Sequence, residues 1–219
     1  MPAASVLLRN APHRPPPEVG LGAGAALRLG RLHEACGDAR RTLALMIAGR
    51  LAVTPDRPVV WITPDWMRDR LHGDGIASFL SPGLMILVAP TRAEDVLWVM
   101  EEVLRTGTAP LAVADLPGLP SLTAVRRMHL AAETGMAEGR VSPLGLILTE
   151  GAGGAPGVES RWRLDARHMV HPTDTGVRGQ EAEGWRLDRL RARTAPPRGW
   201  TLRSGARGVE LHPDRTGAA

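Results

Sequence analysis

The chain has 219 residues, 43% of them hydrophobic, which is enough for one sizeable core or one core with a small appendage. All 27 basic residues are arginine. The lack of lysine excludes Schiff-base catalysis, pyridoxal-phosphate chemistry and an ordinary phosphate-loop lysine. The single cysteine, Cys36, excludes an internal disulfide and an all-cysteine zinc cluster. The formal net charge of +4 comes entirely from residues 151–219, so we expect an electrostatic partner surface near the C-terminus. No apolar run is long enough to span a membrane, and we expect a cytoplasmic protein.

Residues 1–28 are rich in proline, alanine and glycine, which predicts a flexible N-terminal lead-in. From Arg31 to Glu150, short apolar runs alternate with helical patterns. The runs typical of buried parallel strands are residues 32–36, 59–63, 84–88, 111–115 and 144–149. The expected helices are residues 42–52, 93–106 and 121–134, the last two closed by Gly107 and Gly135. This alternation predicts a three-layer α/β domain with a mostly parallel sheet.

After Glu150 the composition changes. Residues 151–157 form a glycine-rich turn or loop, and short segments rich in arginine and tryptophan follow. Residues 199–202 and 209–211 are expected to pair as a hairpin. We therefore divide the chain into the lead-in, a core domain at residues 29–165, and a basic C-terminal extension of strands and loop at residues 166–219.

The segment GRLHEACGDARRTLALMIAGR, which starts at Gly30, has the layout of a strand, a phosphate loop and a helix. A working loop has the pattern G-x-x-x-x-G-K-[ST], in which backbone N–H groups and a lysine bind phosphate and a hydroxyl binds Mg²⁺. Here the loop is shorter and has lost its second glycine and its lysine. Its residues are Gly37, Asp38, Arg40, Arg41 and Thr42. We interpret it as a degenerate phosphate loop, either a tight turn or a simple anion site at a helix N-terminus.

Further motifs follow in order: WITPDW at Trp61, LAVADL at Leu111, RRMHLAAETG at Arg126, PLGLILT at Pro143, GAPGVESRW at Gly154 and WRLDRLRARTAPP at Trp185. Together with the loop segment, they resemble the ImuA family, a RecA-like branch that is found in bacterial mutagenesis operons and is related to SulA. The resemblance covers roughly residues 20–202. It implies a RecA-like core in which Asp115 holds the place of a magnesium-associated aspartate and Asp65 that of a catalytic glutamate. Without a lysine, we interpret both carboxylates as vestigial or as helix caps.

Arginines and tryptophans share one C-terminal segment. Its candidate partner or nucleic-acid residues are Trp185, Arg186, Arg189, Arg191, Arg193, Arg198 and Trp200. Three interpretations remain open: a surface that stacks single-stranded bases, edge strands with tryptophan inward and arginine solvated, or a docking surface for a protein. The spacing of His168 and His171 could suit a metal site, but no cysteine lies near them and the nearby acids stand in a loop-like context. We therefore expect a solvated loop there, with no metal and no cofactor.

The predicted function is that of a non-catalytic, RecA-like accessory protein in SOS-induced, error-prone translesion DNA synthesis. The resemblance implies that it acts through an ImuB-like Y-family polymerase homologue and RecA, with a specialised error-prone polymerase engaged indirectly and direct DNA contact left open. One alternative is a SulA-like inhibitor that binds the tubulin-like division protein. Another is a residual DNA-binding ATPase.

Overall fold

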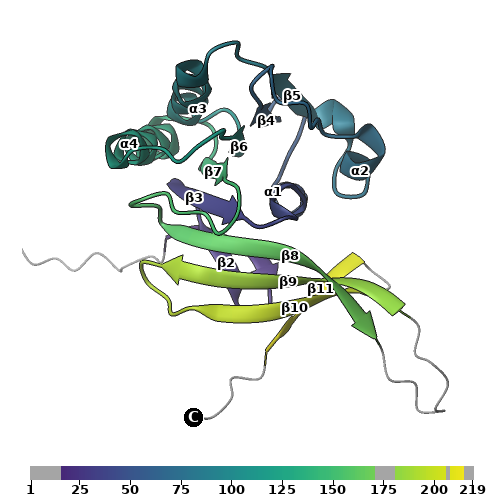
Figure 1. Cartoon of the computed structure of the whole chain (residues 1–219). Coiled ribbons are helices and arrows are strands. Elements are labelled where there is room, and N and C mark those ends of the chain that lie inside the picture. Colours follow the sequence, from purple (N-terminus) through teal and green to yellow (C-terminus); the bar gives the residue numbers. More distant parts are fainter. Residues whose placement is uncertain (1–15, 171–180, 206–207, 215–219) are drawn as a thin grey trace, which may run out of the picture.

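The computed structural model describes residues 16–170, 181–205 and 208–214. They form an α/β structure around a mixed nine-stranded sheet with the strand order β11-β10-β9-β8-β3-β7-β6-β4-β5 (Figure 1). The strands are β3 (Arg31–Cys36), β4 (Val59–Ile62), β5 (Met85–Val88), β6 (Leu111–Asp115), β7 (Leu144–Leu148), β8 (Ser160–Val170), β9 (Glu181–Ala192), β10 (Arg198–Gly205) and β11 (Gly208–Pro213). The sheet is parallel from β5 to β8 and antiparallel from β8 to β11. The predicted α/β class, with parallel strands followed by C-terminal strands, is confirmed.

The parallel half of the sheet is covered on both faces. Every residue of β4, β6 and β7 is buried, as their nearly continuous apolar sequences indicate. Helix α1 (Arg40–Ala48) packs on one face, and α3 (Ala93–Thr106) and α4 (Leu122–Glu138) pack on the other (Figure 1). The short helices α2 (Gly73–Ala77) and η1 (Pro82–Leu84) lie in the connection between β4 and β5.

The ends of α3 and α4 show where glycine acts as a terminator and where it does not. Gly107 closes α3 in the left-handed conformation, at φ +55°, as its position predicts. The prediction that Gly135 ends α4 is wrong, since the helix continues to Glu138. A Cβ at Gly135 would overlap the carbonyl oxygen of Leu104, so this glycine permits α4 to cross the end of α3 at close range.

The predicted flexible lead-in is wrong for its final part. Strands β1 (Glu18–Gly22) and β2 (Ala25–Arg28) form an antiparallel hairpin, while residues 1–15 lie outside the described part. The alternating side chains of the hairpin are buried against Trp162, Leu187, Trp200 and Leu202 of the C-terminal strands. The indole nitrogen of Trp200 donates a 3.0 Å hydrogen bond to the carbonyl of Ala23 in the hairpin turn. The hairpin is ordered because it covers the apolar face of the C-terminal sheet.

The predicted boundary between residues 165 and 166 falls inside β8, which pairs with β3 on one side and with β9 on the other. The sheet is therefore continuous across that point. Within the described residues, no helix is long and apolar enough to cross a membrane.

Candidate functional site

The turn between β3 and α1 is the predicted degenerate phosphate loop, and the backbone amides of its first three residues are already engaged. Each donates to an oxygen of the same chain: Gly37 to the carbonyl of Gly151 at 3.1 Å, Asp38 to the carboxylate of Asp165 at 3.3 Å, and Ala39 to the carbonyl of Leu164 at 3.0 Å. Gly37 adopts φ +87°, and a Cβ there would come within 2.6 Å of both Asp165 Oδ1 and the Leu164 carbonyl. Strand β8 and the loop after β7 thus accept hydrogen bonds from three amides that a phosphate loop would offer to phosphate.

Arg41 and Asp115 form an internal ion pair beside this turn. The Nε of Arg41 donates to Asp115 Oδ2 at 2.8 Å, and the carboxylate at the end of β6 is only 2% exposed. Burial raises the pKa of Asp115, and the guanidinium of Arg41 opposes this shift. The arginine supplies the positive charge that a metal ion would bring to an aspartate at this place.

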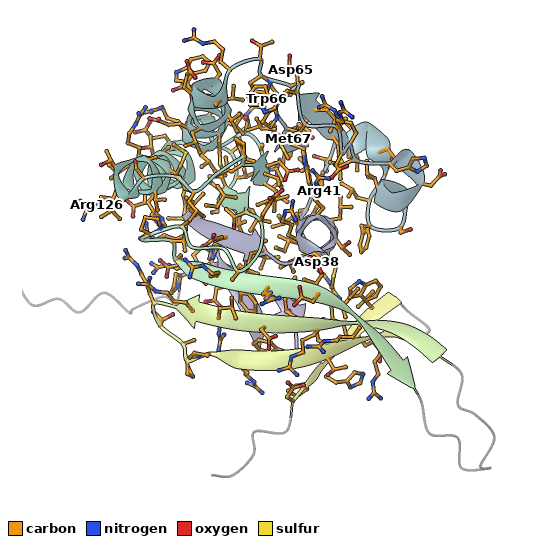
Figure 2. The ribbon with its side chains drawn as sticks, in the orientation of Figure 1. Asp38, Arg41, Asp65, Trp66, Met67 and Arg126 are labelled. Atoms are coloured by element: carbon orange, nitrogen blue, oxygen red, sulfur yellow. The ribbon has the colours of Figure 1, made fainter. Side chains whose placement is uncertain are left out.

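The other loop residues do not converge on a common point. Arg40 donates to the carbonyl of Gly37 at 3.4 Å and lies 3.7 Å from the carboxylate of Glu150. Thr42 points along the outward side of α1, where it lines a groove. The carboxylate of Asp38 is exposed at the turn, where Figure 2 labels it together with Arg41.

Asp65 is not part of the ion-paired centre. It lies exposed in the turn after β4, where its amide donates to the carbonyl of Pro90 at 3.0 Å. The second carboxylate near Arg41 belongs to Asp69, at 4.0 Å. The structure therefore brings Arg41 and Asp115 together, as two of the predicted positions, and leaves Asp65 outside this pair.

The tryptophans of the C-terminal segment face inward. Trp200 is fully buried, Trp185 is half-buried, and Trp162 on the neighbouring strand is fully buried. The guanidinium of Arg189 lies 5.6 Å from the ring centre of Trp162 and 5.5 Å from that of Trp200, and it donates twice to the carbonyl of Pro196. Trp200 and Arg189 are therefore structural parts of the sheet core. This agrees with the interpretation of inward-facing tryptophans, except that Arg189 is buried rather than solvated.

Several arginines of this segment are paired with carboxylates, either on the same strand or from other parts of the chain. Arg186 contacts Asp188 at 2.9 Å and also pairs with Asp214, and Arg193 lies 3.8 Å from Glu159. Arg191 and Arg198 are exposed, and neither has an ion-pair partner among the described residues. The surface of this segment is therefore less basic than its number of arginines indicates.

Glu34 anchors the glycine-rich loop and was not recognised as a key residue from the sequence. Its fully buried carboxylate accepts hydrogen bonds from four residues: Thr149 Oγ1 at 2.7 Å, Gly154 N at 2.8 Å, Ala155 N at 3.1 Å and Arg161 Nε at 2.5 Å. A signal for it does exist, since a glutamate inside an apolar strand must find partners when it is buried.

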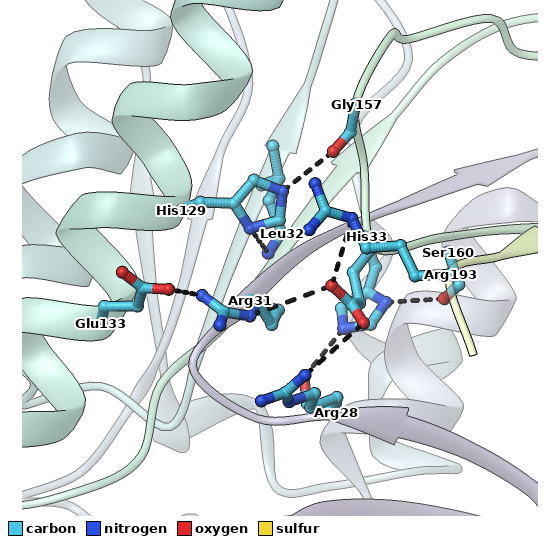
Figure 3. A network of polar contacts seen from close by, with 10 residues as sticks. Arg28, Arg31, Leu32, His33, His129, Glu133, Gly157, Ser160 and Arg193 are labelled. Atoms are coloured by element: carbon cyan, nitrogen blue, oxygen red, sulfur yellow. Dashed lines mark hydrogen bonds and ion pairs between the residues drawn. The ribbon is translucent and has the colours of Figure 1, made fainter. Parts of the chain in front are cut away.

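A second polar network lies on the other side of β3 (Figure 3). His33 Nε2 faces the carbonyl of Arg28 at 2.8 Å, so this nitrogen carries the proton and Nδ1 accepts from the hydroxyl of Ser160 at 2.7 Å. Ser160 in turn accepts from the indole of Trp162 at 2.6 Å. Burial lowers the pKa of His33 to about 4, which keeps the ring neutral.

The buried carboxylate of Glu159 completes this network. Arg28, Arg31 and Arg193 surround it at 3.8–3.9 Å, too far for direct hydrogen bonds. A cavity of about 270 Å³ adjoins it, lined in part by Arg28, His33 and Arg189. Among the described residues, no group of histidine, cysteine, aspartate and glutamate has the arrangement of a metal site.

Comparison with known proteins gives one named relative and one structural neighbour. No model of a known protein family matches the chain. Protein ImuA of Caulobacter vibrioides, from strains NA1000 and ATCC 19089, is 29% identical over 88% of this chain and 82% of its own length. The crystal structure of SulA from Pseudomonas aeruginosa is 21% identical, covers 55% of this chain and 98% of its own, and superimposes with a TM-score of 0.44. The resemblance to the ImuA family that the sequence motifs indicate is thus confirmed by a relative of that name.

Proposed function

We propose that this protein is a non-catalytic accessory factor of the bacterial DNA-damage response that supports error-prone translesion DNA synthesis through protein partners. The observation that carries the proposal is the closed turn before α1, where the amides of Gly37, Asp38 and Ala39 donate to the chain itself. The relationship to ImuA supports the biological setting.

The closed turn disfavours nucleotide binding by a margin that can be worked out. A nucleotide would first have to break three internal hydrogen bonds, each contributing about 1 kcal/mol, which together correspond to more than about a hundredfold in affinity. A magnesium ion would also have to displace Arg41 from Asp115, because the Nε of Arg41 lies 2.8 Å from Asp115 Oδ2. Neither loss is offset by a lysine, because the chain has none.

The proposal includes a RecA-like core at residues 29–165. It is supported by the order of the elements: β3, a short turn and α1 are followed by parallel strands, of which β6 ends in Asp115. In this view the core is a scaffold that has kept its sheet and lost its nucleotide site.

The proposed partners are an ImuB-like Y-family polymerase homologue and RecA, with a specialised error-prone polymerase joining indirectly in the cytoplasm. Arg191, which is exposed, and Arg198, which is exposed with its guanidinium 5.4 Å from the ring centre of Trp200, are positions of the C-terminal segment that a partner or DNA could contact. A partner that recognises the scaffold rather than a nucleotide state should bind equally well with or without ATP.

A pull-down with the full chain and the purified RecA and ImuB-like proteins of the same organism tests this function. We expect at least one of them to bind, with the same yield in ATP, in ADP and without nucleotide. Binding to neither protein, or binding only with ATP, would contradict the proposal. Cell filamentation on overexpression without DNA damage would instead favour the SulA-like alternative.

A further inference from the structure

A groove of about 660 Å³ lies along α1. One wall is a helical stripe at spacings of three and four residues, made of Thr42, Leu45, Met46 and Gly49. The opposite walls come from α2 and the residues after it (Gly75, Ser78 and Phe79) and from the C-terminal strands (Trp185 and Val209). Figure 1 shows α1 beside α2 and above the C-terminal strands.

The composition of the groove is that of a protein interface. Aromatic residues, methionine and arginine are enriched in the cores of such interfaces, and here Met46, Phe79 and Trp185 line the groove with Arg50 at its end. Phe79 and Trp185 are half-buried, so each has a face that a partner can still cover. The Met46 thioether adapts to side chains of different shapes.

A protein segment fits this groove better than a small ligand. The stripe from Thr42 to Gly49 is roughly 10 Å long, which matches two turns of a helix or three residues of extended chain. Two of its polar residues, Thr42 and Arg50, lie at the two ends of the α1 stripe, and Ser78 comes from another wall, whereas the polar groups of most small-molecule sites converge on one point.

The charge at the rim indicates what the segment carries. Arg50 is exposed, and it makes no ion pair with any residue that the structure describes, in contrast to Arg41 at the other end of α1, which is bound to Asp115. An exposed arginine beside an apolar groove is complemented by a carboxylate on the incoming chain.

We propose that this groove docks a short segment of a partner protein that inserts large apolar side chains along α1 and pairs an aspartate or glutamate with Arg50. The docking surface rests on the groove itself, and the partner need be neither RecA nor an ImuB-like protein.

The glycines of α2 provide a matched pair of variants for the test. A Cβ at Gly73 or at Gly75 meets no atom within 4 Å, so both positions accept a side chain, but only Gly75 lines the groove. Gly75→Trp fills the groove, and Gly73→Trp places the same side chain outside it. Arg50→Glu reverses the rim charge, and Arg140→Glu reverses the charge of an exposed arginine away from the groove.

The probe is a phage-displayed library of random 12-residue peptides, selected on the full wild-type chain. We expect enriched peptides to contain large apolar residues next to aspartate or glutamate. Their affinity should fall at least about tenfold with Gly75→Trp and roughly three- to tenfold with Arg50→Glu, and stay unchanged with Gly73→Trp and Arg140→Glu. Thermal unfolding of each variant checks that it is folded, and Ser78→Trp replaces Gly75→Trp if that variant is not.

Three outcomes would overturn the proposal: no enriched peptide, enrichment of basic peptides, or binding that the groove variants leave unchanged. The test is independent of the proposed role in DNA repair. Peptides that bind in the groove, combined with a pull-down that finds neither RecA nor the ImuB-like protein, would keep the docking surface and contradict the proposed function.

Discussion

Replacing His33 by glutamine should remove a large part of the pH dependence of stability. In the folded chain burial lowers the pKa of His33 to about 4, whereas the unfolded chain has the ordinary value of 6.5. Between these values the unfolded chain binds a proton that the folded chain excludes, so the free energy of unfolding falls as the pH drops from 6.5 towards 4. The shift corresponds to about 3 kcal/mol in total, of which about 2 kcal/mol is lost between pH 7 and pH 5.

The hydrogen bonds around the ring give the physical reason. Nε2–H is held by the carbonyl of Arg28 and Nδ1 by the hydroxyl of Ser160, which itself receives the indole N–H of Trp162. A second proton would meet a hydroxyl already oriented as a donor, inside a site that is 1% exposed. His129 adds to the effect, because burial lowers its pKa in the same direction.

Urea unfolding of the wild type and of His33→Gln at pH 7, 6 and 5 measures this contribution. The variant is expected to be less stable at pH 7 and to lose about 2 kcal/mol less than the wild type on going to pH 5. If both proteins lost the same free energy over this range, the reasoning about His33 would be refuted.

Two further substitutions test the packing of the site and of the helices. Arg161→Ala leaves the buried Glu34 without its guanidinium and should destabilise the fold by roughly 3–5 kcal/mol in urea unfolding, whereas Arg163→Ala, at an ion pair whose arginine is 42% exposed, should cost less than about 1 kcal/mol. An equal effect of the two variants would show that Glu34 is not the anchor of the loop. Gly135→Ala forces a methyl group against the end of α3 and should lower the free energy of unfolding by roughly 1–3 kcal/mol. Gly118→Ala, where a Cβ meets nothing within 4 Å, should change it little. If Gly135→Ala were neutral, the close crossing of the two helices would not be the reason for this glycine.

The parallel half of the fold could be predicted because its signals are local. Strands β4, β6 and β7 are continuous apolar runs, and a strand buried on both faces requires that pattern. The end of α3 at Gly107 is equally local, since the left-handed conformation favours glycine. Gly135 is also a glycine near the end of a helix, but its role depends on α3, which packs across α4 at this position.

The hairpin of β1 and β2 was missed for a related reason. Its strands are four or five residues long and lie within a glycine-rich stretch, which by itself indicates a flexible chain. What orders them is the apolar face of β8 to β10, formed by residues more than a hundred positions further along the chain.

The candidate site could be predicted in its residues but not in its contacts. The sequence shows a shortened loop with no lysine, which suggests a lost nucleotide site. It does not show that Leu164 and Asp165 close the loop, because that depends on β8 pairing in parallel with β3. In the same way, the register of β9, β10 and β11 brings Asp214 to Arg186 and neutralises an arginine that the sequence left free.

The most direct test of the closed turn is an amide NMR titration of the full chain with Mg²⁺-ATP. The signals of Gly37, Asp38 and Ala39 report on the N–H groups that donate to β8 and to the loop after β7. We predict that none of them shifts in a saturable way up to about 5 mM nucleotide, since the internal acceptors keep these amides engaged. A saturable shift of these three signals, with a dissociation constant below about 1 mM, would contradict the account and identify a working nucleotide site.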